Sequence, residues 1–290
     1  MEFLAPQRWE DALAAKAEHP DAVPIAGGTD VMVDLNFDRV RPSCLLDLTK
    51  VAELKEWGHD NGALRVGAGV SYARVINELG RFLPGLALAS RTVGSPQIRN
   101  RGTVGGNLGS ASPAGDAHPP LLATGASVEL TSVRGTRVVP IEEFFTGPKR
   151  SVRGPEELIS AFVVRPAAGP QQFCKVGTRN AMVIAVASFA IALDPGQKRV
   201  GTGIGSAAPT PLRAAEAEGF LEGELSAGSS WERRRPLGPT VVAHFSELVA
   251  AAASPIDDVR GTATYRRHTL AVMARRALSW AWAEYAGAEE

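Results

Sequence analysis

Two glycine-centred segments constrain the fold of this chain more than any other feature: residues 24–30 (PIAGGTD) and residues 102–107 (GTVGGN). Glycine has no Cβ atom, so the backbone N–H groups of paired glycines can approach an anion closely. A helix that follows such a segment adds the partial positive charge of its N-terminal amides. The side chains of Thr29, Thr103 and Asn107 offer further hydrogen bonds. Neither segment has a catalytic lysine beside it, so together they predict a clamp around a diphosphate.

Each segment by itself also fits an ordinary turn or helix cap, and only the pair favours a ligand site. Neither matches the P-loop pattern of kinases and ATPases. A third glycine-rich segment, residues 201–206 (GTGIGS), has its last glycine misplaced for a dinucleotide-binding fingerprint. The AAPTP that follows it is a poor helix start. We therefore expect this third segment to be structural.

Composition excludes several classes of protein. The 290 residues carry 31 basic and 31 acidic side chains, so the basic excess typical of nucleic-acid or membrane-surface binding is missing. A hydrophobic content of 44% is typical of a folded globular chain. The two cysteines, Cys44 and Cys174, are too few for a zinc finger, an iron–sulfur cluster or a disulfide scaffold, and no metal site is expected. Without a signal peptide or a membrane-length apolar run, we expect a cytoplasmic protein with no transmembrane segment.

The alternation of apolar runs and breakers indicates three consecutive stretches. The first predicts a helix at 9–18, a strand at 23–25, a helix after the capping residues Thr29 and Asp30, and a strand at 44–48. The second predicts strands at 63–66 and 127–131, with a helix at 71–79 and a glycine-dense loop at 94–115 between them, and it closes with residues 140–145 and 158–164. A boundary follows at 165–170 (RPAAGP). The third predicts strands at 172–176 and 200–204, a surface loop at 222–240 and a helix at 262–285.

The chain resembles a known family, the FAD-binding medium subunits of the molybdenum hydroxylases, which include xanthine dehydrogenase and carbon monoxide dehydrogenase. The resemblance is carried by residues 24–30, by residues 93–108 (VGSPQIRNRGTVGGNL) and by residues 112–116 (SPAGD). Residues 258–261 (DVRG) and 265–267 (YRR) are similar to the last domain of that family. The resemblance covers nearly the whole chain, and the TVGGN segment in its long context is highly specific.

The resemblance implies an α+β fold with three parts. Two subdomains, residues 1–55 and 56–167, would hold FAD in the manner of vanillyl-alcohol oxidase, a PCMH-like arrangement. Residues 168–290 would form a C-terminal αβ domain of the carbon monoxide dehydrogenase flavoprotein type that covers the flavin end. Two cysteines cannot support the iron–sulfur cluster that some members carry in this subunit.

The resemblance also implies cofactor-binding residues, position by position. The first diphosphate segment comprises Pro24, Ile25, Ala26, Gly27, Gly28, Thr29, Asp30 and Val31; the second comprises Thr103, Val104, Gly105, Gly106 and Asn107, with Ser110 nearby. Val93 and Gly94 correspond to a loop on the flavin side, Asp116 to an acid that binds the cofactor, Ile159 to an apolar ring contact and Lys175 to a lysine close to the isoalloxazine. Without the family, Asp116 reads as a turn acid and Lys175 as a solvated strand residue. His118 and Cys174 are expected to be a loop histidine and a buried thiol.

Three functions remain open at this point. The first is an oxidoreductase subunit that binds FAD, takes electrons from the [2Fe–2S] clusters of a small partner subunit, and passes them to NAD, a quinone or oxygen. A molybdopterin-binding large subunit would oxidise the substrate, so no catalytic residue is expected in this chain. The second is a free-standing FAD-dependent oxidase or reductase on the same fold. The third is a non-catalytic binding or assembly protein whose flavin pocket is empty.

Overall fold

The first unit of the chain is a small parallel sheet with two crossover helices. We describe a computed structural model, which covers residues 1–287. The elements of this unit are β1 (Glu2–Leu4), α1 (Trp9–Glu18), β2 (Val23–Ile25), α2 (Val31–Asn36), β3 (Cys44–Asp47) and a 3₁₀-helix (Ala52–Lys55). β3 is central and pairs in parallel with β1 and β2, so helical crossovers must connect the strands. The expected strand–turn–helix–strand order is confirmed. The expected side-chain cap is not, because Asp30 precedes α2 without accepting a capping hydrogen bond.

The second unit contains a five-stranded antiparallel sheet in the order β4-β5-β10-β6-β7. Its strands are β4 (Trp57–Asp60), β5 (Ala63–Gly67), β6 (Ser127–Ser132), β7 (Gly135–Pro140) and β10 (Leu158–Val164), and β8 (Phe145–Gly147) and β9 (Arg150–Ser151) form a separate hairpin. Its helices are α3 (Tyr72–Arg74), a π-helical turn (Val75–Leu79), α4 (Pro84–Arg91), α5 (Pro96–Arg101), α6 (Val104–Ser110), α7 (His118–Ala123) and α8 (Ile141–Phe144).

The glycine-dense loop expected at 94–115 is wrong, since α5 and α6 lie within it. Local chemistry starts both helices. The side chain of Ser95 accepts a hydrogen bond from the Ile98 N–H, and the side chain of Thr103 accepts one from the Gly106 N–H. The glycines within α6 lower its helix propensity, and α5 contains no glycine but lies between Gly94 and Gly102, so the sequence favoured a loop for both. The caps and the tertiary packing stabilise the two helices.

The third unit packs helices against a second antiparallel sheet, in the order β11-β12-β13. Its elements are β11 (Gln171–Val176), β12 (Ala187–Asp194), β13 (Arg199–Gly205), α9 (Ala215–Ala227), α10 (Ser230–Arg233), α11 (Pro239–Ala252) and α12 (Ala263–Ala286). The surface loop expected at 222–240 is largely helical, because Leu225 and Trp231 are buried in the core of this unit and hold α9 and α10 in place. Within residues 1–287, no helix is both long and apolar enough to cross a membrane.

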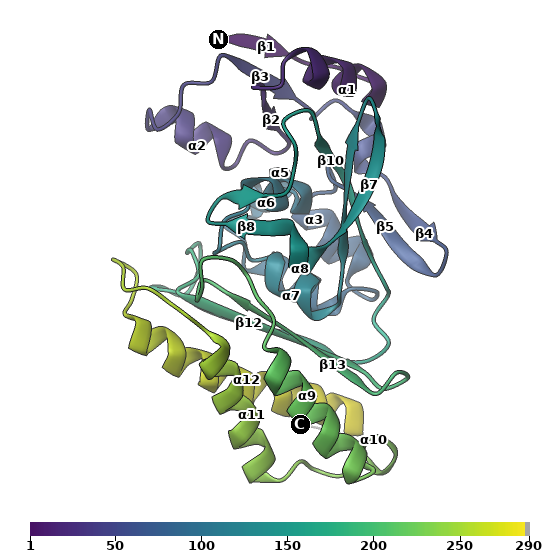
Figure 1. Cartoon of the computed structure of the whole chain (residues 1–290), viewed down its shortest axis with the longest axis vertical. Coiled ribbons are helices and arrows are strands. Elements are labelled where there is room, and N and C mark those ends of the chain that lie inside the picture. The colour runs from purple at the N-terminus through teal and green to yellow at the C-terminus, as the bar shows by residue number, and fades with distance from the viewer. Residues whose placement is uncertain (288–290) are drawn as a thin grey trace.

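The three units are stacked along the long axis of the molecule, as Figure 1 shows. The small parallel sheet lies at one end, and the five-stranded sheet with its short helices lies in the middle. The β11-β12-β13 sheet lies between α7 on one side and α9 and α12 on the other, and α11 packs on α9 and α12. One continuous apolar core joins the first two units, from Ala12 to Val164. A second core fills the third unit, from Ala187 to Trp282. The boundary at residue 55 between two subdomains therefore remains a proposal.

The glycines of β13 allow α7 to lie directly on the third unit. A Cβ atom on Gly201 would lie 1.9 Å from the carbonyl oxygen of Ala123, and one on Gly203 would lie 2.0 Å from that of Pro119. Any side chain would push the helix away from the sheet. The segment 201–206 is therefore a packing feature, as expected, and it joins the second and third units.

Candidate cofactor site

The two glycine segments of the sequence lie against each other in space. A Cβ atom on Gly27 would lie 2.0 Å from the Arg101 carbonyl oxygen and 2.9 Å from the Gly102 Cα. A Cβ atom on Gly106 would lie 3.6 Å from the Cβ of Ala26. The turn that follows β2 and the N-terminal end of α6 thus meet backbone to backbone, a distance that only glycine permits. The predicted pairing of the two segments is a feature of the fold.

Backbone donors remain free in the first segment. Gly28 has a φ of +77°, the left-handed conformation that turns the chain from β2 into α2. In the described part of the chain, the N–H groups of Gly27, Gly28 and Thr29 donate to no carbonyl or side-chain oxygen. Backbone N–H groups that are not paired within the protein are the donors that an anionic phosphate group accepts from.

The second segment is held in place by its own polar side chains. Thr103 Oγ1 accepts from the Gly106 N–H at 2.9 Å, Asn107 Oδ1 accepts from the Ala117 N–H at 3.2 Å, and Ser110 Oγ donates to the Asn107 carbonyl at 2.9 Å. Within this segment, Val104 and Gly105 are buried. A Cβ on Gly105 would lie 2.5 Å from the Ala68 carbonyl, which fixes α6 against the strand end after β5. Several residues of this segment therefore also serve the fold.

Asp116 and Lys175 form a buried ion pair between the second and third units. Lys175 Nζ donates to Asp116 Oδ2 at 2.6 Å and to the Thr92 carbonyl at 3.3 Å. The Lys175 side chain is 7% exposed and the Asp116 side chain is 10% exposed. Burial raises the pKa of Asp116 to about 6, against the opposing effect of the neighbouring Lys175 ammonium. The other carboxylate oxygen, Oδ1, is buried and has no partner in the described residues.

Tyr72 links the glycine segments to Asp116. Its N–H donates to the Gly102 carbonyl, and its ring lies 3.3 Å from where a Gly102 Cβ would be. The hydroxyl is buried and has no hydrogen-bond partner in the described residues. Burial raises the pKa of Tyr72 well above its usual value, and the charges of Asp116 and Asp30 act in the same direction. The phenol therefore stays protonated and lies near both acids as an unused donor.

The remaining predicted residues lie around these groups. Val93 and Gly94 directly follow Thr92, and the Arg99 guanidinium donates to both of their carbonyls, at 3.1 and 3.0 Å. Ile159 lies in β10, is buried, and its Cδ1 is 3.8 Å from where a Gly109 Cβ would lie on α6. Pro24 and Ile25 belong to β2, and Val31 begins α2. All of these positions are on elements that meet at the two glycine segments or at the ion pair.

His118 is a structural residue rather than a loop histidine. It lies in the first turn of α7, its Nε2 donates to the Asn107 carbonyl at 3.1 Å, and its ring packs against Phe145 with centroids 4.6 Å apart. A Cβ on Gly115 would lie 2.2 Å from the imidazole, so this glycine makes room for it. Burial lowers the pKa of His118 to about 4. The neutral imidazole thereby ties α6 to α7.

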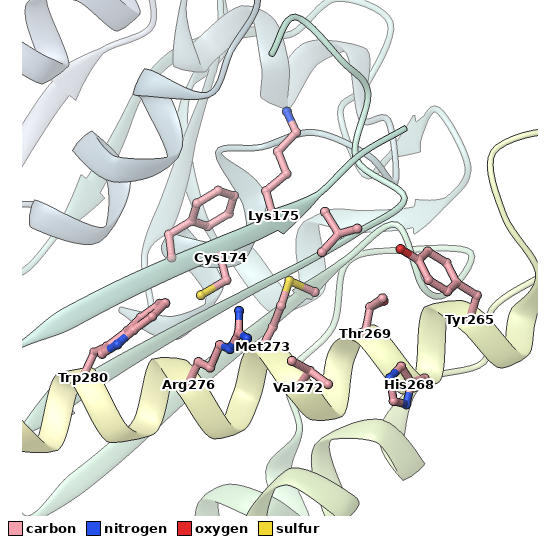
Figure 2. A pocket seen from close by; sticks show the side chains of 11 residues that line it. Cys174, Lys175, Tyr265, His268, Thr269, Val272, Met273, Arg276 and Trp280 are labelled. Carbon is pink, nitrogen blue, oxygen red and sulfur yellow. The ribbon is translucent and has the colours of Figure 1, made fainter. Parts of the chain in front are cut away.

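A groove of about 440 Å³ lies on the other face of β11. Figure 2 shows that Cys174 faces α12, toward Arg276 and Trp280, whereas the side chain of Lys175 points away from that helix. Burial raises the pKa of the Cys174 thiol to about 11, so the thiol is protonated and is no nucleophile at neutral pH. The groove and the ion pair thus lie on opposite sides of one edge strand.

The arrangement fits a flavin dinucleotide in three respects. Among the described residues, the N–H groups of Gly27, Gly28 and Thr29 are unpaired and lie on a segment that touches the N-terminal end of α6, which suits a diphosphate. The orphaned Asp116 Oδ1 and Tyr72 hydroxyl suit the hydroxyl groups of a sugar or ribityl chain. Lys175 supplies a buried cation beyond them. Such a two-segment nucleotide cradle, closed by an αβ domain, defines a class of flavin-binding protein.

Family models match both parts of the chain. Residues 1–166 match "FAD binding domain in molybdopterin dehydrogenase", and residues 172–281 match "CO dehydrogenase flavoprotein C-terminal domain". The chain therefore belongs to the FAD-binding subunits of the molybdopterin dehydrogenases, an oxidoreductase family, and FAD is its cofactor. The resemblance and the α+β fold expected from the sequence are confirmed.

Individual relatives align over nearly their whole length. The xanthine dehydrogenase FAD-binding subunit of Escherichia coli O157:H7 is 31% identical, with 96% of this chain and 94% of the relative covered. The carbon monoxide dehydrogenase medium chain of Afipia carboxidovorans is 30% identical, with 96% and 95% covered. Among solved structures, carbon monoxide dehydrogenase from Hydrogenophaga pseudoflava, in a form that lacks the Mo-pyranopterin moiety, superposes with a TM-score of 0.88 at 26% identity over 98% of both chains.

Proposed function

We propose that this chain takes electrons from the [2Fe–2S] clusters of a partner subunit and passes them, through bound FAD, to NAD, a quinone or oxygen. The observation that carries the proposal is the direct contact between the two glycine segments, the first of which has unpaired N–H groups among the described residues. The buried Tyr72 hydroxyl and the Asp116–Lys175 ion pair lie near them. FAD, when bound, supplies the redox chemistry. The residues of the chain hold it, orient it and set the charge around it.

At the diphosphate end, we assign binding to the backbone rather than to charged side chains. Residues 24–31 and 103–107 present amides, and Thr29 and Thr103 add hydroxyl groups. The Asp30 side chain is exposed and engaged in no helix cap, so its carboxylate is free to accept from a sugar hydroxyl. Because a carboxylate would repel a phosphate, we assign the diphosphate to Gly27–Gly28 rather than to Asp30.

At the flavin end, we assign the side chains near the boundary of the second and third units. Asp116 Oδ1 accepts from a ribityl hydroxyl, and Tyr72 donates to the cofactor between the two ends. Lys175 places a positive charge beside the ring, while Val93, Gly94 and Ile159 supply backbone and apolar contacts.

The names of the relatives support a proposal about partner subunits. Curated relatives carry the names medium chain and medium subunit of dehydrogenases and hydroxylases. We propose that this chain likewise assembles with a molybdopterin-binding large subunit and a [2Fe–2S] small subunit. The free-standing oxidase and the non-catalytic binding protein are less well supported. This chain aligns over nearly its full length with relatives that are named as a subunit or a medium chain of a dehydrogenase.

The first experiment is an absorption spectrum of the purified chain before and after incubation with FAD. Flavin bands that survive removal of excess FAD, and FAD released on denaturation, are the expected result. Gly106→Val should lose the flavin, because a branched side chain there blocks access to the amides of α6. Gly219→Val in α9, where an added Cβ meets nothing within 4 Å, is the control and should keep it. Equal flavin content in both variants would contradict the assignment of the second segment.

The acceptor is identified by reoxidation. The flavin-loaded chain is reduced anaerobically with dithionite and then mixed in turn with NAD, a soluble quinone and oxygen. The compound that restores the oxidised spectrum fastest is the proposed acceptor. If none restores it faster than buffer alone, electron transfer to these acceptors by this chain is contradicted, even where FAD binding holds.

A further inference from the structure

Three side chains that are typical metal ligands lie together at the far end of the molecule from the ion pair. They are Glu2 on β1, His19 directly after α1 and Cys44 at the start of β3, and one ligand atom from each lies within 4.8 Å of the others. His19 Nδ1 is 3.9 Å from a Glu2 carboxylate oxygen. The three positions are 17 and 25 residues apart in sequence, so no spacing pattern predicted the cluster.

The backbone fixes all three positions. Glu2 and Cys44 are direct partners in the parallel register of β1 and β3, and the Glu2 N–H donates to the Ser43 carbonyl at 2.8 Å. The His19 N–H donates to the Ala15 carbonyl, and its own carbonyl accepts from the Ala22 N–H, both at 2.9 Å. The ligand atoms therefore come together through regular structure of the fold and not through flexible loops.

The spacing is close to that of a tetrahedral zinc site. With metal–nitrogen and metal–oxygen bonds of about 2.0–2.2 Å, two ligands of a tetrahedral ion are about 3.3–3.5 Å apart. The His19–Glu2 separation of 3.9 Å closes to that value with a movement of about half an ångström, within reach of side-chain rotation. Cys44 is 3% exposed and its thiol makes only a weak contact with the Leu45 carbonyl, at 3.7 Å, so the sulfur is available.

We propose that Glu2, His19 and Cys44 bind a divalent cation of the zinc class, with a water molecule as the fourth ligand. A thiolate and an imidazole select Zn²⁺ or Co²⁺ over Mg²⁺ and Ca²⁺, which prefer all-oxygen sites. The ion ties the edge strand β1 and the end of α1 to β3. β1 is only three residues long and half exposed, so such a staple stabilises the unit that carries the first glycine segment.

The charged neighbours of the cluster are compatible with a cation. Lys16 on α1 is the basic side chain that acts on Cys44. Its Nζ donates to the Pro20 and Ala22 carbonyls, at 2.7 and 2.6 Å. Burial, together with the charge of Arg153, lowers the pKa of Lys16 to about 8, and Asp21 nearby is negative.

The test uses Co²⁺ as the probe, added to the metal-stripped full chain under reducing, oxygen-free conditions. The expected result is a thiolate-to-cobalt charge-transfer band in the difference spectrum, saturating at one equivalent and displaced by Zn²⁺. Cys44→Ser should abolish the band, and His19→Gln and Glu2→Gln should weaken Co²⁺ binding at least about tenfold. The flavin content of all three variants should match the unsubstituted chain, which separates this outcome from a failure of the FAD assignment.

Matched controls come from the same chain. Cys174→Ser removes the other thiol, and His244→Gln removes a histidine that lies 3.5 Å from Glu247 without a cysteine nearby. Both should leave the band unchanged. A band lost in Cys174→Ser, a band retained in Cys44→Ser, or no cobalt binding at all overturns the proposal. Because Cys44 is buried and its variant could misfold, the exposed Glu2→Gln variant is decisive: equal Co²⁺ affinity there also overturns it.

Discussion

Lys175 Nζ lies 2.6 Å from Asp116 Oδ2, and this buried ion pair joins β11 of the third unit to the segment before α7 of the second. The two residues are 59 positions apart in sequence. The lysine also donates to the Thr92 carbonyl, next to Val93 and Gly94. This ion pair thus contributes both to the junction between the two units, beside the packing of α7 on β13, and to the charge at the proposed flavin end.

Lys175→Met should destabilise the chain more at pH 8 than at pH 5. Removing one partner of a buried pair costs about 3–5 kcal/mol when the other remains charged. Without the ammonium, the pKa of Asp116 rises further above its value of about 6, so the folded state is penalised as pH rises through that range. At pH 5 the carboxyl is protonated and the loss is smaller. Urea unfolding at the two pH values measures the difference.

Lys198→Met is the control for this prediction. Lys198 pairs with Glu232 at the same 2.6 Å, but both side chains are about half exposed. An exposed pair contributes about 0–1 kcal/mol, with little dependence on pH in this range. If the two variants lose the same free energy of unfolding, or if Lys175→Met loses equally at both pH values, the buried pair has no special role.

Gly27→Ala should separate the two glycine segments and release the flavin. The added Cβ would lie 2.0 Å from the Arg101 carbonyl oxygen, and backbone atoms of a helix end cannot move aside without shifting α5. We expect FAD affinity to fall at least about tenfold, or about 1.4 kcal/mol, measured by flavin fluorescence on titration. Gly223→Ala in α9 meets nothing within 4 Å and should bind FAD unchanged. Unchanged FAD affinity in Gly27→Ala would mean that contact between the segments is not needed.

The sequence predicted the site better where local chemistry determines it. Thr103 accepts from the Gly106 N–H three residues on, and Asn107 from the Ala117 N–H ten residues on, so this part of the pattern is readable in one stretch of sequence. The contact of Gly27 with Arg101 is visible only in the folded chain. Asp116 and Lys175 were found only through the family resemblance, since nothing in either segment shows that a residue 59 positions away neutralises it.

Long-range packing explains what the sequence did not predict. Tyr72 carries no motif, and only the folded chain shows its hydroxyl buried near Asp30 and Asp116. The glycines of α6 lower its helix propensity, and α5 was missed because it lies between Gly94 and Gly102. The helix α10 was missed because it lies in a polar segment, which the buried Trp231 holds in place. The cluster of Glu2, His19 and Cys44 could not be predicted from the sequence, because it depends on the register that pairs Glu2 of β1 with Cys44 of β3.

The buried His118 predicts a loss of stability in mild acid. Its folded-state pKa is lowered to about 4, whereas the unfolded chain titrates at its usual value of 6.5. The unfolded state therefore binds a proton first, and the free energy of unfolding falls as pH drops from 6.5 to 4, by up to about 3 kcal/mol from this residue.

His118→Asn should flatten that part of the pH profile, at the cost of lower stability at pH 7. An asparagine does not titrate, but it leaves a cavity beside Phe145 and Gly115. His244→Gln, which removes an exposed histidine, should leave the profile unchanged. Thermal unfolding at half-unit steps from pH 4.5 to 7.5 compares the three proteins. A slope in His118→Asn equal to that of the unsubstituted chain would assign the acid sensitivity elsewhere.

Tyr72→Phe separates the folding role of this residue from its role toward the cofactor, because the two effects have opposite signs. A buried hydroxyl without a partner costs free energy, so its removal should stabilise the flavin-free chain by about 1 kcal/mol. If the hydroxyl donates to FAD, the same change should weaken FAD binding about two- to tenfold, the value of one hydrogen bond. Unfolding of the flavin-free protein and FAD titration measure the two quantities.

The control is Tyr265→Phe, since that residue is 46% exposed on α12 and should change neither quantity. Two results would contradict the assignment of Tyr72. FAD affinity equal to that of the unsubstituted chain would mean that the hydroxyl does not contact the cofactor, whatever its effect on folding. A loss of stability in the flavin-free Tyr72→Phe chain would mean that the hydroxyl already has a partner, such as a buried water, and is not held ready for a ligand.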